Sequence, residues 1–276
     1  MIATKSIHIT LNITQIMAVE HIGGFTRIVK YGDIDQIRKF INKNDVHNID
    51  LEEMTPLHYA IKRNDPEIVQ ILIDYGADLN TNDSEHHRHA LHVRNSDGFT
   101  PLHYAVSLVN VNLDIVQLLI KGSDVNSKIP NVYSILHTAC YHKGPILVET
   151  LIKAGADVNE NNNQDGRYPL HVAVLYSDLD TIKCLLDNGA DVNATNNDEE
   201  TALHLAAEND RIEVVKILLL YGADKNLASN AVYYNELGHS FHGTPEEIAR
   251  HRGYHEVADY IRDYHSTENI KEPEFD

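Results

Sequence analysis

A six-residue segment that recurs at a nearly constant spacing constrains the fold of this chain more than any other feature. The segment Thr-Pro-Leu-His-Tyr-Ala occupies residues 55–60 and 100–105, and weaker versions begin at Ser134, Tyr168 and Thr201. The steps between their histidines are 45, 34, 34 and 33 residues. A second motif, Gly-Ala-Asp-x-Asn or a close variant, keeps the same phase and begins at Gly76, Gly122, Gly155, Gly189 and Gly222. Two motifs in phase over five copies indicate a repeat array, in which each unit packs only against its neighbours.

The copy that begins at Thr201 illustrates how one repeat is expected to fold. Thr201 is a favourable N-cap, because its hydroxyl can accept a hydrogen bond from an unpaired backbone N–H. Leu203 and Ala206 then lie on one face of a short first helix. A second helix follows, with apolar residues at helical spacing over residues 214–219, and Gly222 ends it by accepting a left-handed backbone. The leucines of the last four hexapeptides are predicted to be buried, namely Leu102, Leu136, Leu170 and Leu203.

The hexapeptide and its period resemble those of the ankyrin repeat. This resemblance implies an all-α ankyrin-repeat solenoid of stacked helix-turn-helix units with β-hairpin fingers. It implies that the recurring histidines at 58, 103, 137, 171 and 204 join a hydrogen-bond network between neighbouring repeats rather than a catalytic or metal site. It also marks three asparagines, Asn80, Asn159 and Asn193, as optional hydroxylation sites.

The phase of the two motifs predicts the domain organisation. We expect an N-terminal extension at residues 1–20 and an acidic tail at 266–276, with two capping repeats inside them at 21–53 and 243–265. Five full repeats lie between the caps, at residues 54–98, 99–132, 133–166, 167–199 and 200–242. The first of these includes a long histidine-rich finger, and the fifth a second long finger.

Charge and cysteine content exclude several classes of function. The net charge of -18 opposes binding to nucleic acid or to an anionic membrane surface, and it leaves a basic protein partner open. Two cysteines form no disulfide framework, which favours a reducing compartment, the cytoplasm or else the nucleus. No apolar run approaches the ~20 residues of a membrane span. No phosphate-binding loop, nucleophile elbow or zinc-protease motif is present, so we expect no enzyme activity and no cofactor.

Two segments that link repeats are longer than the others. Residues 80–100 and 226–244 span 20 and 18 steps, against 8 for residues 193–201. The first carries four histidines within 86–92, which could bind zinc or copper, but nothing fixes their geometry. We therefore predict no stoichiometric metal there, and a loop that gains charge on acidification. The aromatic residues of the second segment either contact a partner or pack over the last repeat.

The partner-binding surface follows from the resemblance, because partners of ankyrin proteins usually lie in the concave groove. Counted from the Thr position, the exposed residues are expected three and one residues before it and seven and eight after it. We predict a non-catalytic monomer that binds a protein partner there, as an adaptor or inhibitor; the alternative is a regulatory or targeting subunit of an enzyme complex. Tyr141 and Tyr176 are the expected anchors, and the acids are expected to face a basic segment. The candidate residues are Phe99, Leu108, Tyr133, Tyr141, His142, Leu175, Tyr176, Asp198, Glu200 and Glu208. Apolar residues scattered on a surface are the competing interpretation.

Overall fold

The computed structural model describes residues 24–42, 45–48, 54–80, 99–127, 133–141, 144–162, 164–234 and 240–265. The chain divides into two compact units, residues 1–124 and 125–276. Four sequence predictions lie outside the described residues: the N-terminal extension, the histidine loop at 86–92, His142 and the acidic tail.

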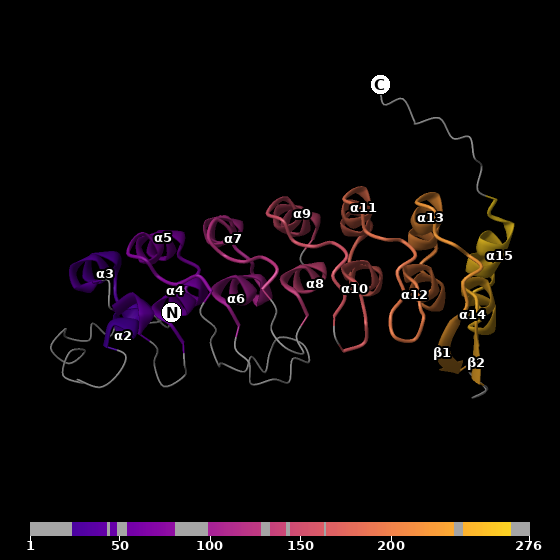
Figure 1. Ribbon diagram of the computed structural model, residues 1–276, viewed down its shortest axis with the longest axis horizontal. Coiled ribbons are helices and arrows are strands. Elements are labelled where there is room, and N and C mark those ends of the chain that lie inside the picture. Colours follow the sequence, from indigo (N-terminus) through magenta and orange to yellow (C-terminus); the bar gives the residue numbers. More distant parts are fainter. Residues whose placement is uncertain are drawn as a thin grey trace, which may run out of the picture. The chain divides into compact units, whose positions relative to one another are not determined.

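The first unit consists of helix pairs in two rows (Figure 1). Helices α2, α4 and α6 pack side by side in one row, and α3, α5 and α7 pack in the other. The bounds of these elements are α2 (Gly24–Tyr31), α3 (Ile34–Phe40), the 3-10 helix η1 (Asp45–His47), α4 (Pro56–Lys62), α5 (Pro66–Asp74), α6 (Pro101–Ser107) and α7 (Leu113–Ile120). The turn between α6 and α7 lies open to solvent, with Val109 89% exposed.

The second unit repeats this plan. The first helices of its repeats, α8, α10, α12 and α14, form one row, and the second helices α9, α11, α13 and α15 form the other (Figure 1). The elements are α8 (Ile135–Cys140), α9 (Pro145–Lys153), α10 (Pro169–Tyr176), α11 (Leu179–Asp187), α12 (Ala202–Glu208), α13 (Ile212–Leu220), β1 (Ser229–Tyr234), β2 (Ser240–Gly243), α14 (Pro245–His251) and α15 (His255–Asp263). Helix pairs in two rows are the all-α arrangement that the repeat pattern predicts.

Local chemistry sets where the helices begin and end. The Thr201 hydroxyl accepts a hydrogen bond from the backbone N–H of His204, which confirms the predicted N-cap of α12. Proline opens α4, α6 and α10, where its missing N–H breaks no helical bond. Helix α13 ends before Gly222, whose φ of 89° is strained for any residue with a side chain.

The core of each unit runs between its two rows of helices. The hexapeptide leucines are at most 1% exposed, which confirms their predicted burial, and Val214, Val215, Leu218 and Leu219 of α13 are buried as well. The predicted hairpin fingers are found in part. The long fifth finger forms an antiparallel hairpin, in which Ser229 pairs with Gly243 and Tyr233 with Phe241. Two shorter fingers close instead through single backbone bonds, from Asn162 to the Arg167 carbonyl and from Asn196 to the Glu200 carbonyl.

Candidate protein-binding face

The recurring histidines connect successive repeats. His137 Nε2 donates to the carbonyl of Arg167 (2.9 Å), and His171 Nε2 donates to the carbonyl of Glu200 (3.1 Å). In the first unit, His58 makes the equivalent bond to the carbonyl of Phe99 (3.2 Å). Each acceptor directly precedes the first helix of the next repeat. The network implied by the resemblance is therefore confirmed at these three histidines.

Burial keeps the histidines of the second unit neutral. Desolvation lowers the pKa of His137, His171 and His204 to about 4, although backbone hydrogen bonds oppose the change. A neutral ring that donates from Nε2 keeps Nδ1 as an acceptor, and at His137 that atom lies 2.7 Å from the Ser134 hydroxyl. At His137 and His171 both ring nitrogens take part in hydrogen bonds, so these two rings are structural bridges between repeats.

The asparagines at the fifth position of the second motif form a second set of hydrogen bonds between successive repeats. The Asn159 side chain donates to the Gly189 carbonyl (2.9 Å) and accepts from the Asp191 N–H (2.8 Å). Asn193 makes the same two bonds to Gly222 and Asp224 (3.3 and 2.8 Å). Both polar atoms of each amide thus join one repeat to the next, and hydroxylation of these residues stays a prediction.

Tyr141 and Tyr176 lie in direct contact, with ring centroids 4.2 Å apart and planes inclined at 32°. Tyr141 caps the C-terminus of α8, and Tyr176 is the last residue of α10. Tyr176 is 37% exposed, and Leu175 beside it is half-buried. Burial, reinforced by the neighbouring phenol of Tyr176, raises the pKa of Tyr141. Two consecutive repeats therefore present one aromatic surface.

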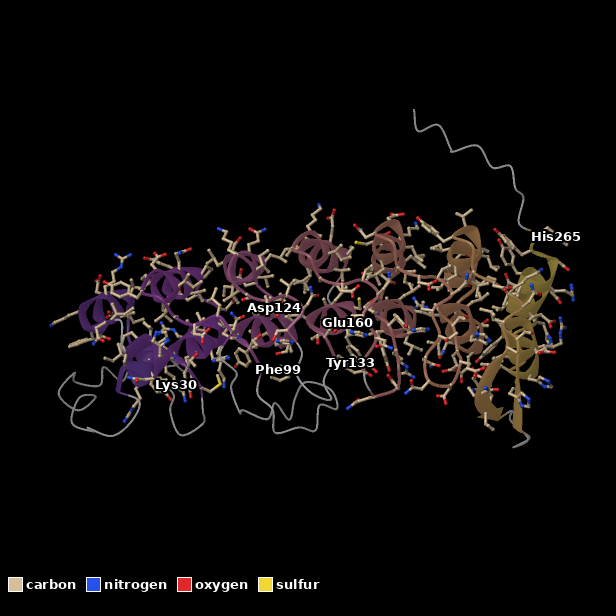
Figure 2. The ribbon with its side chains drawn as sticks, in the orientation of Figure 1. Lys30, Phe99, Asp124, Tyr133, Glu160 and His265 are labelled. Atoms are coloured by element: carbon tan, nitrogen blue, oxygen red, sulfur yellow. The ribbon has the colours of Figure 1, made fainter. Side chains whose placement is uncertain are left out.

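Tyr133 lies just before α8 and is labelled in Figure 2. Its side chain is half-buried, with its ring centroid 5.6 Å from that of His137. Burial, followed by the charge of Asp165, raises its pKa. Tyr133 thus packs partly against its own repeat, and only part of its side chain contributes to the surface.

Two candidate residues are not on the surface, so the expectation of exposed side chains was wrong for them. Phe99, in the first unit, is 8% exposed, and its ring centroid lies 6.2 Å from that of His103. Glu200 is 6% exposed, because Tyr233 of the hairpin lies over it and its hydroxyl donates a hydrogen bond to the carboxylate. Asn196 donates to the other carboxylate oxygen at 2.7 Å. The spacing that predicted both positions could not anticipate these partners.

The other two candidate acids, Asp198 and Glu208, differ in their exposure to solvent. Asp198, at the tip of the finger that precedes α12, is exposed. Glu208, at the end of α12, is half-buried and forms an ion pair with Arg252, so most of its charge is compensated. Leu108 is half-buried and belongs to the first unit. The surface formed by Tyr133, Tyr141, Leu175, Tyr176, Asp198 and Glu208 is called the first-helix face below.

A hollow of about 400 Å³ continues the first-helix face toward the C-terminus of the second unit. Its walls are Asp198, Glu200, Glu208, Ala231, Val232, Tyr233 and Arg252. Val232 is 59% exposed at its rim, whereas Tyr233 is buried and packs on Ile248. Sequence reasoning missed Arg252, although it lies eight residues after Thr244, the same offset that was counted in the full repeats. No offset could have found Val232, because it lies in β1 of the long fifth finger, outside the positions counted from the hexapeptide.

Across the described ranges, no group of three or more His, Cys, Asp or Glu side chains is arranged to hold a metal ion. Over the same ranges, every helix is too short or too polar to span a bilayer.

Comparisons with known proteins agree with the repeat architecture. A family model described as ankyrin repeats, in three copies, matches residues 25–129 and 136–229. Mouse Rabankyrin-5 is 33% identical over 158 residues, which cover 56% of this chain and 12% of that protein. The chicken nuclear factor NF-kappa-B p105 subunit is 32% identical over 174 residues, covering 60% of this chain and 16% of that protein.

Among solved structures, the ankyrin repeat domain of Bcl-3, described as a unique member of the IkappaB protein family, matches with a TM-score of 0.67. The match covers 86% of this chain and 97% of that domain at 24% identity, so it shows a shared fold. The chain spans less than a fifth of the length of the two relatives. Their repeats, rather than their whole architectures, are what this chain shares.

Proposed function

Because this chain belongs to the ankyrin repeat family, whose repeats are protein–protein interaction modules, we propose that it binds a protein partner on its first-helix face. In this proposal the chain is a non-catalytic adaptor or inhibitor. The alternative is a regulatory or targeting subunit, which would hold its partner and an enzyme at the same time. A complex that contains an enzyme activity would favour that alternative.

The contact between Tyr141 and Tyr176 is the observation that carries the proposal. Two tyrosines from successive repeats meet on one face, and their rings stay partly exposed beside Leu175. Tyrosine offers a large contact area with few torsions to freeze, and it is enriched among the residues that dominate binding energy. A partner that covers this pair would bury an aromatic surface that is already ordered.

Charge supports a basic segment in the partner. The chain carries 41 acidic and 23 basic residues, and Asp198 is exposed beside the hollow at the end of the first-helix face. Since Glu208 is paired with Arg252 and Glu200 is buried, Asp198 is the acid that remains available to a partner's cation. Such a rim charge acts mainly on the rate of association.

The proposal is tested by identifying a partner through affinity capture and then titrating the purified partner against Tyr176→Ala. We expect the dissociation constant to rise about 30-fold, equivalent to ~2 kcal/mol. Tyr260→Ala is the matched control, because Tyr260 is 36% exposed but lies on α15 in the other row of helices. If Tyr260→Ala weakens binding while Tyr176→Ala does not, the partner lies on the second-helix row and the assignment is wrong.

The charge component has its own test. Asp198→Lys should slow association with a basic partner and reduce the dependence of the rate on salt, whereas the dissociation rate should change little. Asp180→Lys, at an exposed acid on α11, is the control. An association rate equally slow in both variants would indicate a general effect of net charge rather than a contact at Asp198.

A further inference from the structure

One repeat departs from the others at the fourth position of the Gly-Ala-Asp-x-Asn motif. This position holds an apolar residue in four copies, Leu79, Val125, Val158 and Val192, and a lysine, Lys225, in the fifth. A lysine is costly where an apolar residue normally packs, unless its ammonium group finds acceptors. The substitution therefore calls for a partner that the other repeats lack.

Lys225 finds that partner at the end of the last helix. Its Nζ donates to three backbone carbonyls, those of Ile261 (3.1 Å), Arg262 (2.8 Å) and Tyr264 (2.6 Å). The final carbonyls of a helix have no intrahelical donor, and together they form the negative end of the helix dipole. One ammonium group thus supplies hydrogen bonds and a positive charge to the C-terminus of α15.

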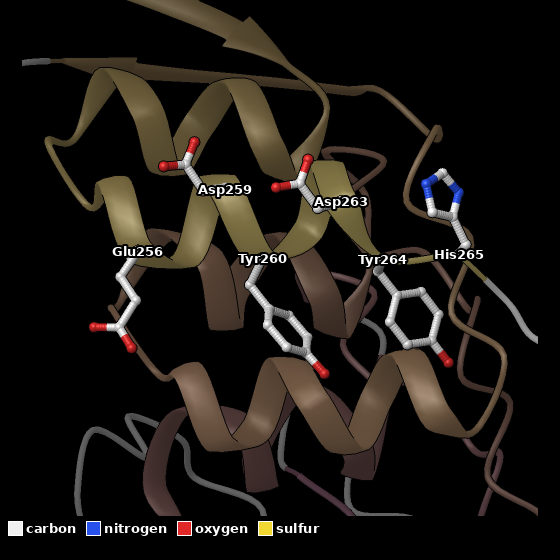
Figure 3. Close-up of a pocket in the computed structure, with 6 residues that line it drawn as sticks. All are labelled: Glu256, Asp259, Tyr260, Asp263, Tyr264 and His265. Atoms are coloured by element: carbon white, nitrogen blue, oxygen red, sulfur yellow. The ribbon is translucent and has the colours of Figure 1, made fainter.

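A second contact ties the same turn to the neighbouring helix. Figure 3 shows Tyr260 and Tyr264 extending from α15 on one side of the helix. The Tyr264 hydroxyl donates to the carbonyl of Leu219 in α13, at 3.0 Å. The hydrogen bonds of Lys225 and Tyr264 therefore join the end of α15 to residues that lie 36 to 45 positions earlier in the chain.

We infer that Lys225 is a cationic latch that holds the terminal helix α15 against the array, so that loss of its charge lets α15 open while the preceding repeats stay folded. Helix α15 packs on α13 of the preceding repeat, and this interface helps to hold it in place. Helix α15 contributes three fully buried apolar residues to it, Val257, Ala258 and Ile261. Opening would uncover these residues together with the facing side of α13, and would change the C-terminal edge of the second unit.

Hydrogen exchange measured by mass spectrometry tests the latch in the full-length chain. In Lys225→Met, which keeps the length of the side chain but removes its charge, we expect amides of α15 to exchange roughly tenfold faster. Amides of α8–α11 should exchange at the wild-type rate. Lys225→Arg keeps a cation that can reach the same carbonyls, and it should restore most of the protection.

Two comparisons keep the result unambiguous. Lys153→Met removes a lysine on α9 that pairs with Glu149, and it should leave the exchange of α15 unchanged. Tyr264→Phe removes the second tie and should add to the effect of Lys225→Met. Wild-type exchange of α15 in Lys225→Met would overturn the inference. Equal acceleration in all helices would overturn it as well, because Lys225 would then act on the whole unit.

Discussion

At the scale of single residues, a threonine or serine directly before a first helix performs two tasks. The Thr201 hydroxyl caps α12 by accepting from the His204 N–H (3.4 Å), and it also contacts His204 Nδ1 at 2.8 Å. Thr100 makes the same contact with His103 at 2.6 Å. Tyr168 has no hydroxyl in this place, and only its backbone N–H reaches His171 Nδ1 (3.0 Å). At His58 and His137, where a hydroxyl makes this contact and Nε2 bonds to the next repeat, the hydroxyl couples the start of a helix to the bridge between repeats.

Thr201→Ala should lower the free energy of unfolding by about 1–2 kcal/mol, because it removes an N-cap and leaves a buried imidazole nitrogen without its hydroxyl partner. Thr201→Ser keeps the hydroxyl and should cost clearly less. Urea denaturation followed by circular dichroism measures both. A loss as large in the serine variant as in the alanine variant would show that the methyl group, rather than the hydroxyl, matters.

At the scale of elements, stability comes from packing each first helix between its two neighbours. Helix α10 contacts α8 on one side and α12 on the other, and Leu170 on its inner face is 1% exposed. Leu175, five residues further along α10, is only half-buried. Replacing each of these two leucines with alanine therefore distinguishes the effect of side-chain burial from the effect of helix propensity.

Leu170→Ala should lower the free energy of unfolding by ~2–5 kcal/mol, since it removes buried methyl groups and leaves a cavity between three helices. Leu175→Ala should cost much less, because its side chain already contacts solvent. Denaturation midpoints of the two variants provide the measurement. Equal midpoints would contradict the assignment of Leu170 to the core and with it the phase of the repeats.

At the scale of the whole molecule, the buried histidines make stability depend on pH. The pKa of His137, His171 and His204 is about 4 in the folded chain, below the ordinary value of 6.5. Above pH 6.5 both states are neutral at these sites and the contribution to stability is complete. As the pH falls from 6.5 toward 4, the unfolded chain takes up protons that the folded chain cannot, and stability is lost.

Between pH 7 and pH 5, each such histidine should lower the free energy of unfolding by about 2 kcal/mol. Denaturation at a series of pH values measures this loss. His171→Gln should be less stable at pH 7 but should show a smaller pH dependence, because one titrating group is gone. An unchanged pH dependence in that variant would mean that other groups are responsible.

The repeat architecture could be predicted because its signals are local. The cap at Thr201, the stop at Gly222 and the burial of Leu170 all follow from residues within one turn of each other and from the 33- to 45-residue period. The same count places Tyr141 seven and Tyr176 eight residues after the first position of their hexapeptides, and the two rings lie in contact. What recurs in sequence recurs in space when each unit stacks on the next in the same way.

The tertiary structure alone decided the features that lie outside the period. Glu200 is buried because Tyr233, 33 residues away, folds back over it, and Lys225 serves the end of a helix that begins 30 residues later. Neither contact follows from the repeat pattern, so no comparison between copies of the motif could reveal it. From sequence alone, a charged side chain is expected to be exposed to solvent. Whether it is instead buried depends on whether the fold places a hydrogen-bond partner beside it.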